Sequence, residues 1–461
     1  MKNYINKLLA VGVIASTSLG LFAQNTRSGY FVEDYTFRYQ MNPAYGNSKR
    51  FVSMPGLGNV NVGMQGTLGV SDVLYNVDGK TTTFLNPGVS AQEVMDNIGD
   101  GGKMGVAVNI PVLAAGFHAF KGYNTVTIGV RSDVNVKLPG EIFSLMKNGI
   151  SNQTYNIGGL KANANLYAEI ALNHSHQITE DLRVGGTFKF LLGGGNVVAD
   201  MREATLELGE NDWRVTTDAD VNASVKGWQY KTKTKTLKNS TEERTYVNGV
   251  DIDGTGLNGF GIGVDLGAIY KTPVEGLTVS ASVNDLGFIS WNNNVLASTG
   301  GKRTFNTDRY TFNFDDDADN SFKNEWDIIQ DDLTNLYEVS DMGDQGGRTT
   351  ALNATMNIGV EYALPSYKNL TFGLLNTTRF AGDFTWTDFR LSANVAPCKI
   401  FSGGVNLGVG TYGVSFGFLA NLHMTGFNLF VGMDRVPGKL AKQGVPLNSN
   451  MAVNLGLNFP F

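Results

Sequence analysis

The sequence predicts an all-β fold: a closed antiparallel transmembrane β-barrel of about 14 strands, within a range of about 12–16, with an N-terminal plug and long extracellular loops that carry short helices. Three observations predict it. Many segments alternate apolar and polar residues for longer than a soluble sheet requires, their polar faces carry charges, and their connections alternate between short and long. We expect a signal peptide at 1–23, a plug or hatch segment at 24–56 and the barrel at 57–461.

The composition limits the classes of partner. The chain has 461 residues, a net charge of −6 and a single cysteine, Cys398. Nucleic-acid binding requires a basic surface that neutralises phosphates, and the sequence has no basic stripe, so we expect no nucleic-acid partner. Apart from the stretch near residue 8, no apolar run is long enough for a transmembrane helix. Any membrane attachment of the exported chain must therefore use β-strands.

The N-terminus has the order of a secretory signal peptide. Lys2 and Lys7 precede the apolar run 8–15, and Ala23 is the last residue before a plausible cleavage site. Gln24 rather than a cysteine follows this site, so we expect no lipid anchor. The next segment, 24–56, is polar with interspersed aromatic residues and has too little apolar surface to fold alone. We expect it to lie against or inside the barrel.

The strands are predicted from period-2 alternation. In 123–136, Val130 and Val134 share one face, whereas Arg131 and Asp133 lie on the other. A strand of a soluble sandwich is usually about half this long, whereas a membrane-spanning strand needs roughly 9–11 residues. Fourteen strands are predicted, at 57–70, 104–118, 123–136, 160–174, 182–193, 257–271, 277–289, 351–364, 370–381, 385–396, 401–410, 412–422, 426–434 and 451–461.

The polar faces of these strands predict a charged lumen. A dry sandwich core does not tolerate unpaired charges, so apolar-out and polar-in is the arrangement that the alternation favours. Charges of both signs suit either ion pairs that brace a plugged barrel or a polar path. Inward glycines such as Gly261, Gly263 and Gly267 fit either barrel curvature or a hollow wall for the plug or a ligand. The predicted inward charges are Arg131, Lys161, Glu169, Arg183, Lys189, Glu361 and Arg390.

The connections give an independent indication. Short links at 119–122, 175–181, 272–276, 365–369, 397–400 and 423–425 alternate with long ones, with 382–384 and 411 as exceptions. Short periplasmic turns and long external loops are typical of outer-membrane barrels. Within the loops the sequence predicts a hairpin over 203–225 and helices at 90–98, 140–148 and 325–339, the first with a Ser90/Glu93 capping box.

The last strand closes the predicted barrel. From Met451 to Phe461 every odd position is apolar, and a membrane barrel leaves no strand edge unpaired, so this strand must pair with 57–70. Phe459 and Phe461 then lie at the periplasmic aromatic girdle. We expect the barrel-assembly machinery to read them as an assembly signal, and we expect outer-membrane lipid to contact the apolar face.

The helix predicted at 325–339 offers a candidate ligand groove. Its apolar face must be buried on the barrel rim, on another loop or on a ligand, and acidic residues lie opposite that face. The groove candidates are Trp326, Ile329, Leu333, Leu336 and Tyr337.

The sequence does not predict catalysis or a cofactor. His118, His174, His176 and His423 all fall near predicted periplasmic turns, and no nucleophile is arranged with a base. Asp315, Asp316, Asp317 and Asp319 form an acidic run that is a weak candidate for Ca²⁺, but the EF-hand pattern is absent and a solvated loop is the simpler interpretation. We therefore expect no enzyme activity, no cofactor and no resident metal.

Two short motifs resemble a known group. Asn42-Pro43-Ala44, followed by Met54-Pro55-Gly56-Leu57-Gly58-Asn59-Val60-Asn61-Val62, resembles an uncharacterised Bacteroidetes outer-membrane barrel family, with Met54 where that family has leucine. The family looks related to the wider FadL-like group, fourteen-stranded barrels with an N-terminal hatch, which includes PorV-like partners of type IX secretion. The resemblance implies that Asn42, Pro43 and Ala44 sit in a hatch and that loop helices form a groove for a hydrophobic ligand.

These observations leave two hypotheses for a protein of the Gram-negative outer membrane. The first is a FadL-like transporter or binder of a small hydrophobic or amphipathic molecule. The alternative is a PorV-like scaffold for a surface-protein partner or for type IX secretion, which the length of the loops favours. The charged lumen argues against passage of fatty acids.

Overall fold

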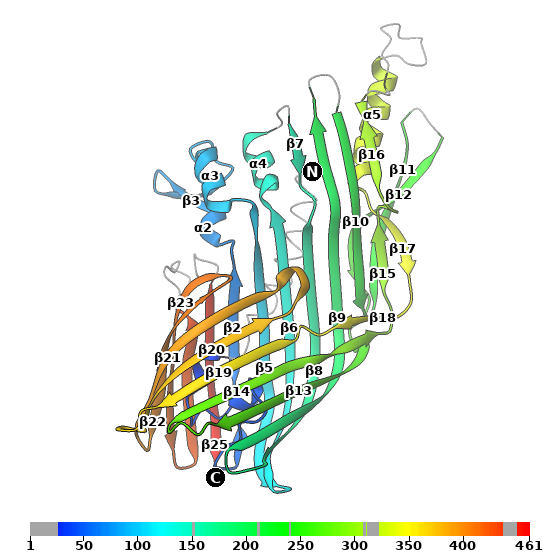
Figure 1. Cartoon of the computed structure of the whole chain (residues 1–461). Helices are drawn as coiled ribbons and strands as arrows, with labels where there is room; N and C mark the ends of the chain where they lie inside the picture. The colour runs from blue at the N-terminus through cyan, green and yellow to red at the C-terminus, as the bar shows by residue number, and fades with distance from the viewer. Residues whose placement is uncertain are drawn as a thin grey trace.

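The computed structural model describes residues 26–149, 153–209, 213–238, 241–307, 310, 322–436 and 450–461. These residues form a closed antiparallel barrel of fourteen strands (Figure 1), each paired with the next in chain order and the last paired with the first. Every predicted strand has a counterpart, so the predicted fold class and strand number are confirmed. Closure follows from pairs such as Val60 with Leu455, which join β2 to β25.

The barrel strands, in order around the ring, are β1 (Phe51–Ser53) continued by β2 (Val60–Gly66), β5 (Gly101–Ala119), β6 (Gly122–Pro139), β8 (Leu160–Gln177), β9 (Leu182–Leu208), β13 (Gly259–Lys271), β14 (Leu277–Trp291), β18 (Arg348–Ala351) continued by β19 (Thr355–Ala363), β20 (Leu370–Arg379), β21 (Trp386–Cys398), β22 (Phe401–Gly410), β23 (Gly413–Met424), β24 (Phe427–Arg435) and β25 (Met451–Pro460). The short connections lie together at the end where the C-terminus is found (Figure 1). We call this the turn end and the opposite end the loop end.

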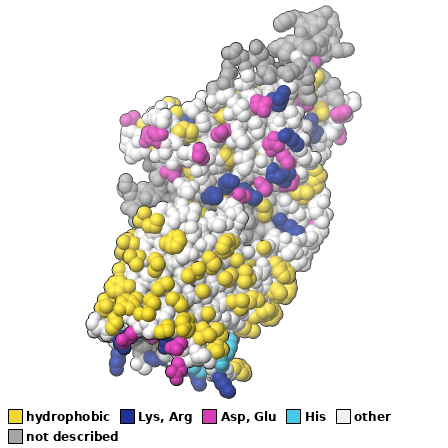
Figure 2. Space-filling model, in the orientation of Figure 1, with side chains coloured by type: hydrophobic (Ala, Val, Ile, Leu, Met, Phe, Trp, Pro, Cys, Tyr) yellow, Lys and Arg dark blue, Asp and Glu magenta, His cyan; other side chains and the backbone are white. Residues whose placement is uncertain are grey.

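The outer surface of the barrel is apolar. On β21, Phe389 and Leu391 face outward and are exposed, whereas Arg390 between them is buried in the lumen. Figure 2 shows the resulting band of hydrophobic side chains, with charged side chains above and below it. An apolar band around a polar interior is the arrangement of a membrane-spanning barrel. Among the described helices, none is both long and apolar enough to cross a membrane.

The elements at the loop end rise above this band (Figure 1). The upper half of β9 continues beyond the barrel and pairs with β10, which confirms the hairpin predicted over 203–225. The predicted helices are also present, and Ser90 Oγ accepts the capping hydrogen bond from the Glu93 amide. These elements are α2 (Val70–Val73), β3 (Leu74–Val77), β4 (Lys80–Thr83), α3 (Ala91–Ile98), α4 (Gly140–Asn148), β7 (Thr154–Asn156), β10 (Trp213–Val225), β11 (Trp228–Thr236), β12 (Glu243–Ile252), β15 (Val295–Ser298), β16 (Arg303–Asn306), α5 (Phe322–Tyr337) and β17 (Ser340–Asp344).

The first strand differs from the prediction of one strand at 57–70. It begins at Phe51, inside the range assigned to the plug, and residues 54–59 leave the ladder before β2 resumes it. Pro55 has no N–H to donate and Gly56 has a φ of +70°, so this stretch cannot continue a regular strand. The strand also ends at Gly66. Leu68 packs instead with Val94 of α3 in a cluster above the barrel.

Candidate functional site

The described part of the N-terminal segment, residues 26–50, lies inside the barrel toward the turn end (Figure 1). We call it the plug. Its aromatic side chains are buried against inward residues of the wall, and the rings of Tyr35 and Phe430 meet edge to face with centroids 5.0 Å apart. Burial of aromatic surface contributes strongly to ordering a segment that has almost no regular structure of its own. The cluster comprises Tyr30, Phe31, Val32, Tyr35, Phe37, Tyr39, Met41, Phe51, Ala114, Tyr123, Leu375, Leu419 and Phe430.

Asn42, Pro43 and Ala44 lie at the inner face of the wall. Asn42 has no exposed surface, and its Oδ1 accepts a hydrogen bond of 3.0 Å from the Ala44 amide. Asn173 donates to the Pro43 carbonyl at 3.1 Å, and Ser175 donates to the Ala44 carbonyl at 2.6 Å. The segment is therefore held by side chains of β8, while its action as a hatch stays a prediction.

Two wall glycines make this close approach possible. A Cβ at Gly185 would lie 2.1 Å from the Pro43 carbonyl oxygen, and a Cβ at Gly267 would lie 2.1 Å from Asn42 Oδ1. Any larger residue at either position would displace the plug. The inward glycines are expected to serve either barrel curvature or a hollow in the wall. At Gly267 the wall is hollow, and the N-terminal segment packs into the space.

A second contact, which sequence analysis missed, ties the start of the plug to the wall. In the 3₁₀ turn η1 (Arg27–Gly29), Arg27 Nε lies 3.1 Å from Asp434 of β24, and Nη1 lies 3.2 Å from Asp388 of β21. The Arg27 and Ser28 amides also donate to Asp434, at 2.8 and 2.7 Å. All of these side chains are buried, so the pairs are shielded from water. We call Arg27, Asp388 and Asp434 the latch.

Above the plug, ion pairs cross the lumen. Arg131 of β6, the third strand, places Nη1 3.0 Å from each carboxylate oxygen of Asp285 on β14, the seventh. Its Nε lies 3.0 Å from Glu169, and Lys189 Nζ lies 2.6 Å from Asp285 and 2.7 Å from Asp265. The structure therefore brings the predicted charges Arg131, Glu169 and Lys189 together.

Asp285 escaped prediction because of a β-bulge. The register between β13 and β14 shifts next to it, its φ is +61°, and it follows another buried residue, Asn284. A bulge places two successive side chains on the same face and reverses the alternation beyond it. The inward position of Asp285 could not be obtained by counting along the strand.

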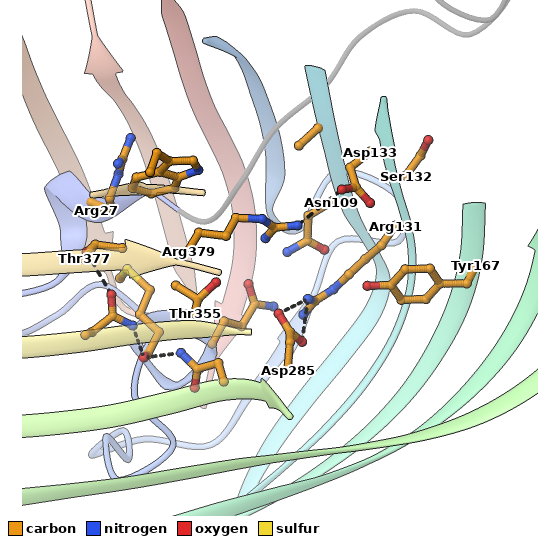
Figure 3. Close-up of a pocket in the computed structure, with 16 residues that line it drawn as sticks. Arg27, Asn109, Arg131, Ser132, Asp133, Tyr167, Asp285, Thr355, Thr377 and Arg379 are labelled. Atoms are coloured by element: carbon orange, nitrogen blue, oxygen red, sulfur yellow. Dashed lines mark hydrogen bonds and ion pairs between the residues drawn. The ribbon is translucent and has the colours of Figure 1, made fainter. Parts of the chain in front are cut away.

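Another pair crosses the lumen nearer the loop end. Arg379 at the end of β20, the ninth strand, places Nη2 3.4 Å from Asp133 Oδ1 on β6. Asn353 donates to the same oxygen at 2.9 Å. Figure 3 shows Arg379 reaching across toward Asp133 and Asn109. This contact is longer than the crossing between Arg131 and Asp285 and involves a single nitrogen.

The connection between β20 and β21, residues 380–385, reaches across the lumen at the loop end to β6 and β8. In its 3₁₀ turn η4 (Gly382–Phe384), Asp383 lies 3.0 Å from Lys161 of β8 and 3.5 Å from Lys137 of β6. The hydrogen bond from Lys161 holds the pKa of the Asp383 carboxyl below its ordinary value. We call residues 380–385 the roof. From the sequence this link is only an exception to the alternation of short and long connections, at 382–384.

A cavity, which we call the chamber, lies in the lumen between the plug residues Arg27, Gln40 and Met41 and the crossing formed by Asp133 and Arg379 (Figure 3). It has about 660 Å³ of space free of protein atoms, part of it open to solvent. A second cavity of about 580 Å³ shares Arg27, Ala107, Asp133, Arg379 and Trp386 with it and includes Phe384 of the roof. The lining is mostly polar: Arg27, Gln40, Met41, Ala107, Asn109, Arg131, Ser132, Asp133, Tyr167, Asn284, Asp285, Thr355, Asn357, Thr377, Arg379 and Trp386.

The groove candidates on α5 do not line an open groove. Ile329 and Leu336 are buried against Phe305 and Tyr310, and Leu333 packs at the edge of this cluster. Tyr337 is 40% exposed. The apolar face is thus covered by other loop elements above the barrel, β16 and β10, and not by the barrel rim or by an open groove. The side chain of Trp326 lies outside the described part of the structure.

The remaining predicted residues lie apart from the chamber. Phe459 and Phe461 are exposed at the turn end of β25, and Asp315, Asp316, Asp317 and Asp319 fall outside the described residues. His423 Nε2 lies 3.3 Å from Asp34. Within the described residues, no three or more His, Cys, Asp or Glu side chains gather as a metal site would require.

The fold is similar to solved transport barrels at low sequence identity. The toluene transporter TbuX of Ralstonia pickettii matches with a TM-score of 0.43 and 9% identity, covering 96% of this chain and 98% of its own. The toluene transporter TodX of Pseudomonas putida matches with a TM-score of 0.38 and 10% identity, and the match covers 94% of this chain and 92% of TodX. A FadL homologue of Pseudomonas aeruginosa matches with a TM-score of 0.36 and 10% identity, and the match covers 96% of this chain and 98% of the homologue.

No curated protein matches the sequence. A family model matches residues 43–434, which include the Asn-Pro-Ala segment of the plug and nearly all of the barrel. The chain therefore belongs to the family of unknown function DUF5723.

Proposed function

We propose that the protein is a transport barrel of the Gram-negative outer membrane that admits a small amphipathic or polar molecule to the chamber. One observation carries the proposal: the plug, tied by the Arg27 latch, lines the chamber, and the roof, tied by Asp383, lines the second cavity that adjoins it. The apolar band around the wall supports a membrane location. A purely structural barrel would need no cavity in its lumen next to charged contacts that can separate.

The lining of the chamber supports a molecule that carries polar groups. The chamber is lined by the polar side chains of Asn109, Asn284 and Thr355, by Asn357 and Thr377, which hydrogen-bond to each other, and by Trp386, whose ring lies against the Arg27 guanidinium. A purely hydrophobic molecule would desolvate these groups without replacing their hydrogen bonds. Of the expected ligand classes, hydrophobic or amphipathic, we therefore favour an amphipathic molecule over a purely hydrophobic one.

Reconstitution tests this function. Purified protein in liposomes is expected to admit small solutes at a measurable rate. Protein with Arg27→Ala and Asp383→Ala together is expected to admit them faster, because both closures are released. Native mass spectrometry of the detergent-extracted protein should also report a bound small molecule. Liposomes that stay impermeable with both the unchanged protein and the double variant, combined with protein that carries no molecule, would rule out transport.

A scaffold for other surface proteins remains the second candidate, and the described extramembrane elements support it. The β10 hairpin, the β11–β12 hairpin and α5 build a structure above the rim that a simple pore does not need. Crosslinking on intact cells is expected to recover a partner protein if this role holds. Recovery of the monomer alone would argue against it.

A further inference from the structure

The ion pair between Asp133 and Arg379 differs from the other charged contacts of the chamber. Arg131 contacts both Asp285 and Glu169, and Arg27 contacts both Asp388 and Asp434. Arg379 has one carboxylate contact at 3.4 Å, and the two side chains keep 18% and 12% of their surface exposed inside the lumen. They come from opposite walls, β20 and β6, and both line the two cavities. This is the crossing that a solute can replace with the least rearrangement.

We propose that the chamber binds a small zwitterion, of the amino-acid or short-peptide class, between Asp133 and Arg379. In this arrangement the carboxylate of the solute meets the Arg379 guanidinium and its ammonium group meets Asp133. The inference rests on the proposed transport function, since it names the substrate class of the same chamber.

Charge balance decides between classes of solute. A neutral solute that separates the two side chains leaves a carboxylate and a guanidinium without their opposite charge in a lumen where both side chains are mostly buried. An anion satisfies only Arg379 and a cation satisfies only Asp133. A zwitterion replaces both contacts with new charge-assisted hydrogen bonds, so the pair can separate without leaving a charge unpaired.

The surrounding groups suit such a molecule. Asn284 is buried at the chamber wall and donates to the Met41 carbonyl at 2.7 Å, yet its Oδ1 has no hydrogen-bond partner among the described residues. This free acceptor suits the N–H of a peptide group or an ammonium group. Trp386 and Tyr167 line the same space and give apolar surface for a short side chain.

The experiment compares three probes on detergent-purified protein by isothermal titration calorimetry. The probes are the dipeptide alanylalanine, its N-acetyl derivative and its C-terminal amide. We expect alanylalanine to bind about tenfold or more tightly than either derivative, because each derivative loses one charged contact. Equal affinity of all three probes, or no binding by alanylalanine, would overturn the inference.

Matched variants assign the two contacts. Asp133→Asn should weaken alanylalanine about tenfold but leave the N-acetyl derivative unchanged, because that derivative has no ammonium group to lose. Arg379→Gln should weaken alanylalanine and leave the amide unchanged. A variant that weakens all probes alike would show a structural role instead. Arg202→Gln, which removes the ion pairs with Asp218 and Asp220 above the barrel, serves as the control and should leave every affinity unchanged.

Liposome uptake separates the two levels of the proposal. Uptake of a neutral sugar by protein that does not bind alanylalanine would refute the zwitterion and retain transport. Tight binding of alanylalanine with no uptake by the double variant described above would retain the binding site and refute transport.

Discussion

Asp383, between β20 and β21, accepts a hydrogen bond of 3.0 Å from Lys161 of β8, although these strands lie on opposite sides of the fourteen-stranded ring. It is one of three levels at which charges bridge the lumen. Alternate residues of a strand share a face, and Arg131, Asp133 and Lys137 of β6 each reach a partner on the far side. A barrel of this size is thus divided into a plugged lower part and a covered chamber.

The roof should respond to pH. Because the pKa of Asp383 is lowered, its contribution to closure is fully present above its unfolded value near 4 and is lost as the pH falls through the lower folded value. Asp383 is 40% exposed, so the contribution is about 1 kcal/mol or less. Spin labels at Thr385→Cys and Thr154→Cys, in a Cys398→Ser background, should report a longer distance at pH 3 than at pH 7.

Asp383→Asn should give the longer distance at both pH values. Asp251→Asn provides the matched control, because Asp251 is also paired with a lysine, Lys231, but lies on the β11–β12 hairpin away from the roof. A distance that is unchanged by pH and by Asp383→Asn would show that the roof is held by other contacts.

The latch should hold the plug in place inside the barrel. Arg27→Ala leaves Asp388 and Asp434 buried without one of their cations, and breaking a buried pair in this way typically costs about 3–5 kcal/mol. We expect a lower midpoint of unfolding and a larger single-channel conductance in planar bilayers. Arg202→Ala removes the partly exposed ion pairs with Asp218 and Asp220 above the barrel, far from the latch, and should leave the conductance unchanged and the midpoint nearly so. Wild-type conductance in Arg27→Ala would mean that the latch does not restrain the plug.

The glycine at 185 should be required for docking of the plug. Gly185→Ala places a Cβ against the Pro43 carbonyl, whereas at the adjacent Gly186 the nearest atom lies 3.7 Å from a Cβ. We expect Gly185→Ala to destabilise the plugged barrel by about 1–3 kcal/mol and to increase protease cleavage within residues 26–50. Gly186→Ala should leave both unchanged. Equal protection in the two variants would show that the wall accommodates the methyl group by other movements.

The barrel itself could be predicted from the sequence because its signal is local. Each strand carries its own alternation, and the cap of α3 and the limits of α4 depend on residues a few positions apart. The inward orientation of Arg131 and Lys189 could be predicted from the same alternation. Their partners could not be predicted, because alternation assigns a face but not the strand opposite.

Other parts of the site had no periodic signal at all. Arg27 lies in a segment without regular structure, and Asp383 lies in a connection too short to suggest a function. The interruption at 54–59 was hidden because the apolar residues of β2 keep their spacing beyond it. Asp285 was hidden by the bulge that reverses the alternation of β14.

The apolar face of α5 should stabilise the extramembrane part of the protein and should not bind a ligand. Ile329→Ala removes buried contacts with Phe305 and Tyr310 and is expected to destabilise the extramembrane part by about 2–5 kcal/mol. Tyr337→Ala, on the exposed side of the helix end, should change stability little. Thermal unfolding measures the first effect, and native mass spectrometry measures any bound molecule. Loss of a bound molecule in Ile329→Ala without loss of stability would instead support the ligand groove.

The final residue should matter for assembly rather than for the folded barrel. Phe461 is 70% exposed, and its amide donates to the Arg50 carbonyl at 2.9 Å after Pro460, which has no N–H. Its ring adds little to the packed core, so deletion should leave the unfolding midpoint of purified protein nearly unchanged. If the assembly machinery reads the terminal aromatic residues, deletion of Phe461, and more so deletion together with Phe459→Ala, should lower the amount of protein in the outer membrane severalfold. Phe120→Ala is the matched control, since Phe120 is an 82% exposed aromatic residue in a connection at the same end of the barrel. Equal membrane levels in the deletion and control variants would show that the end of β25 is not such a signal.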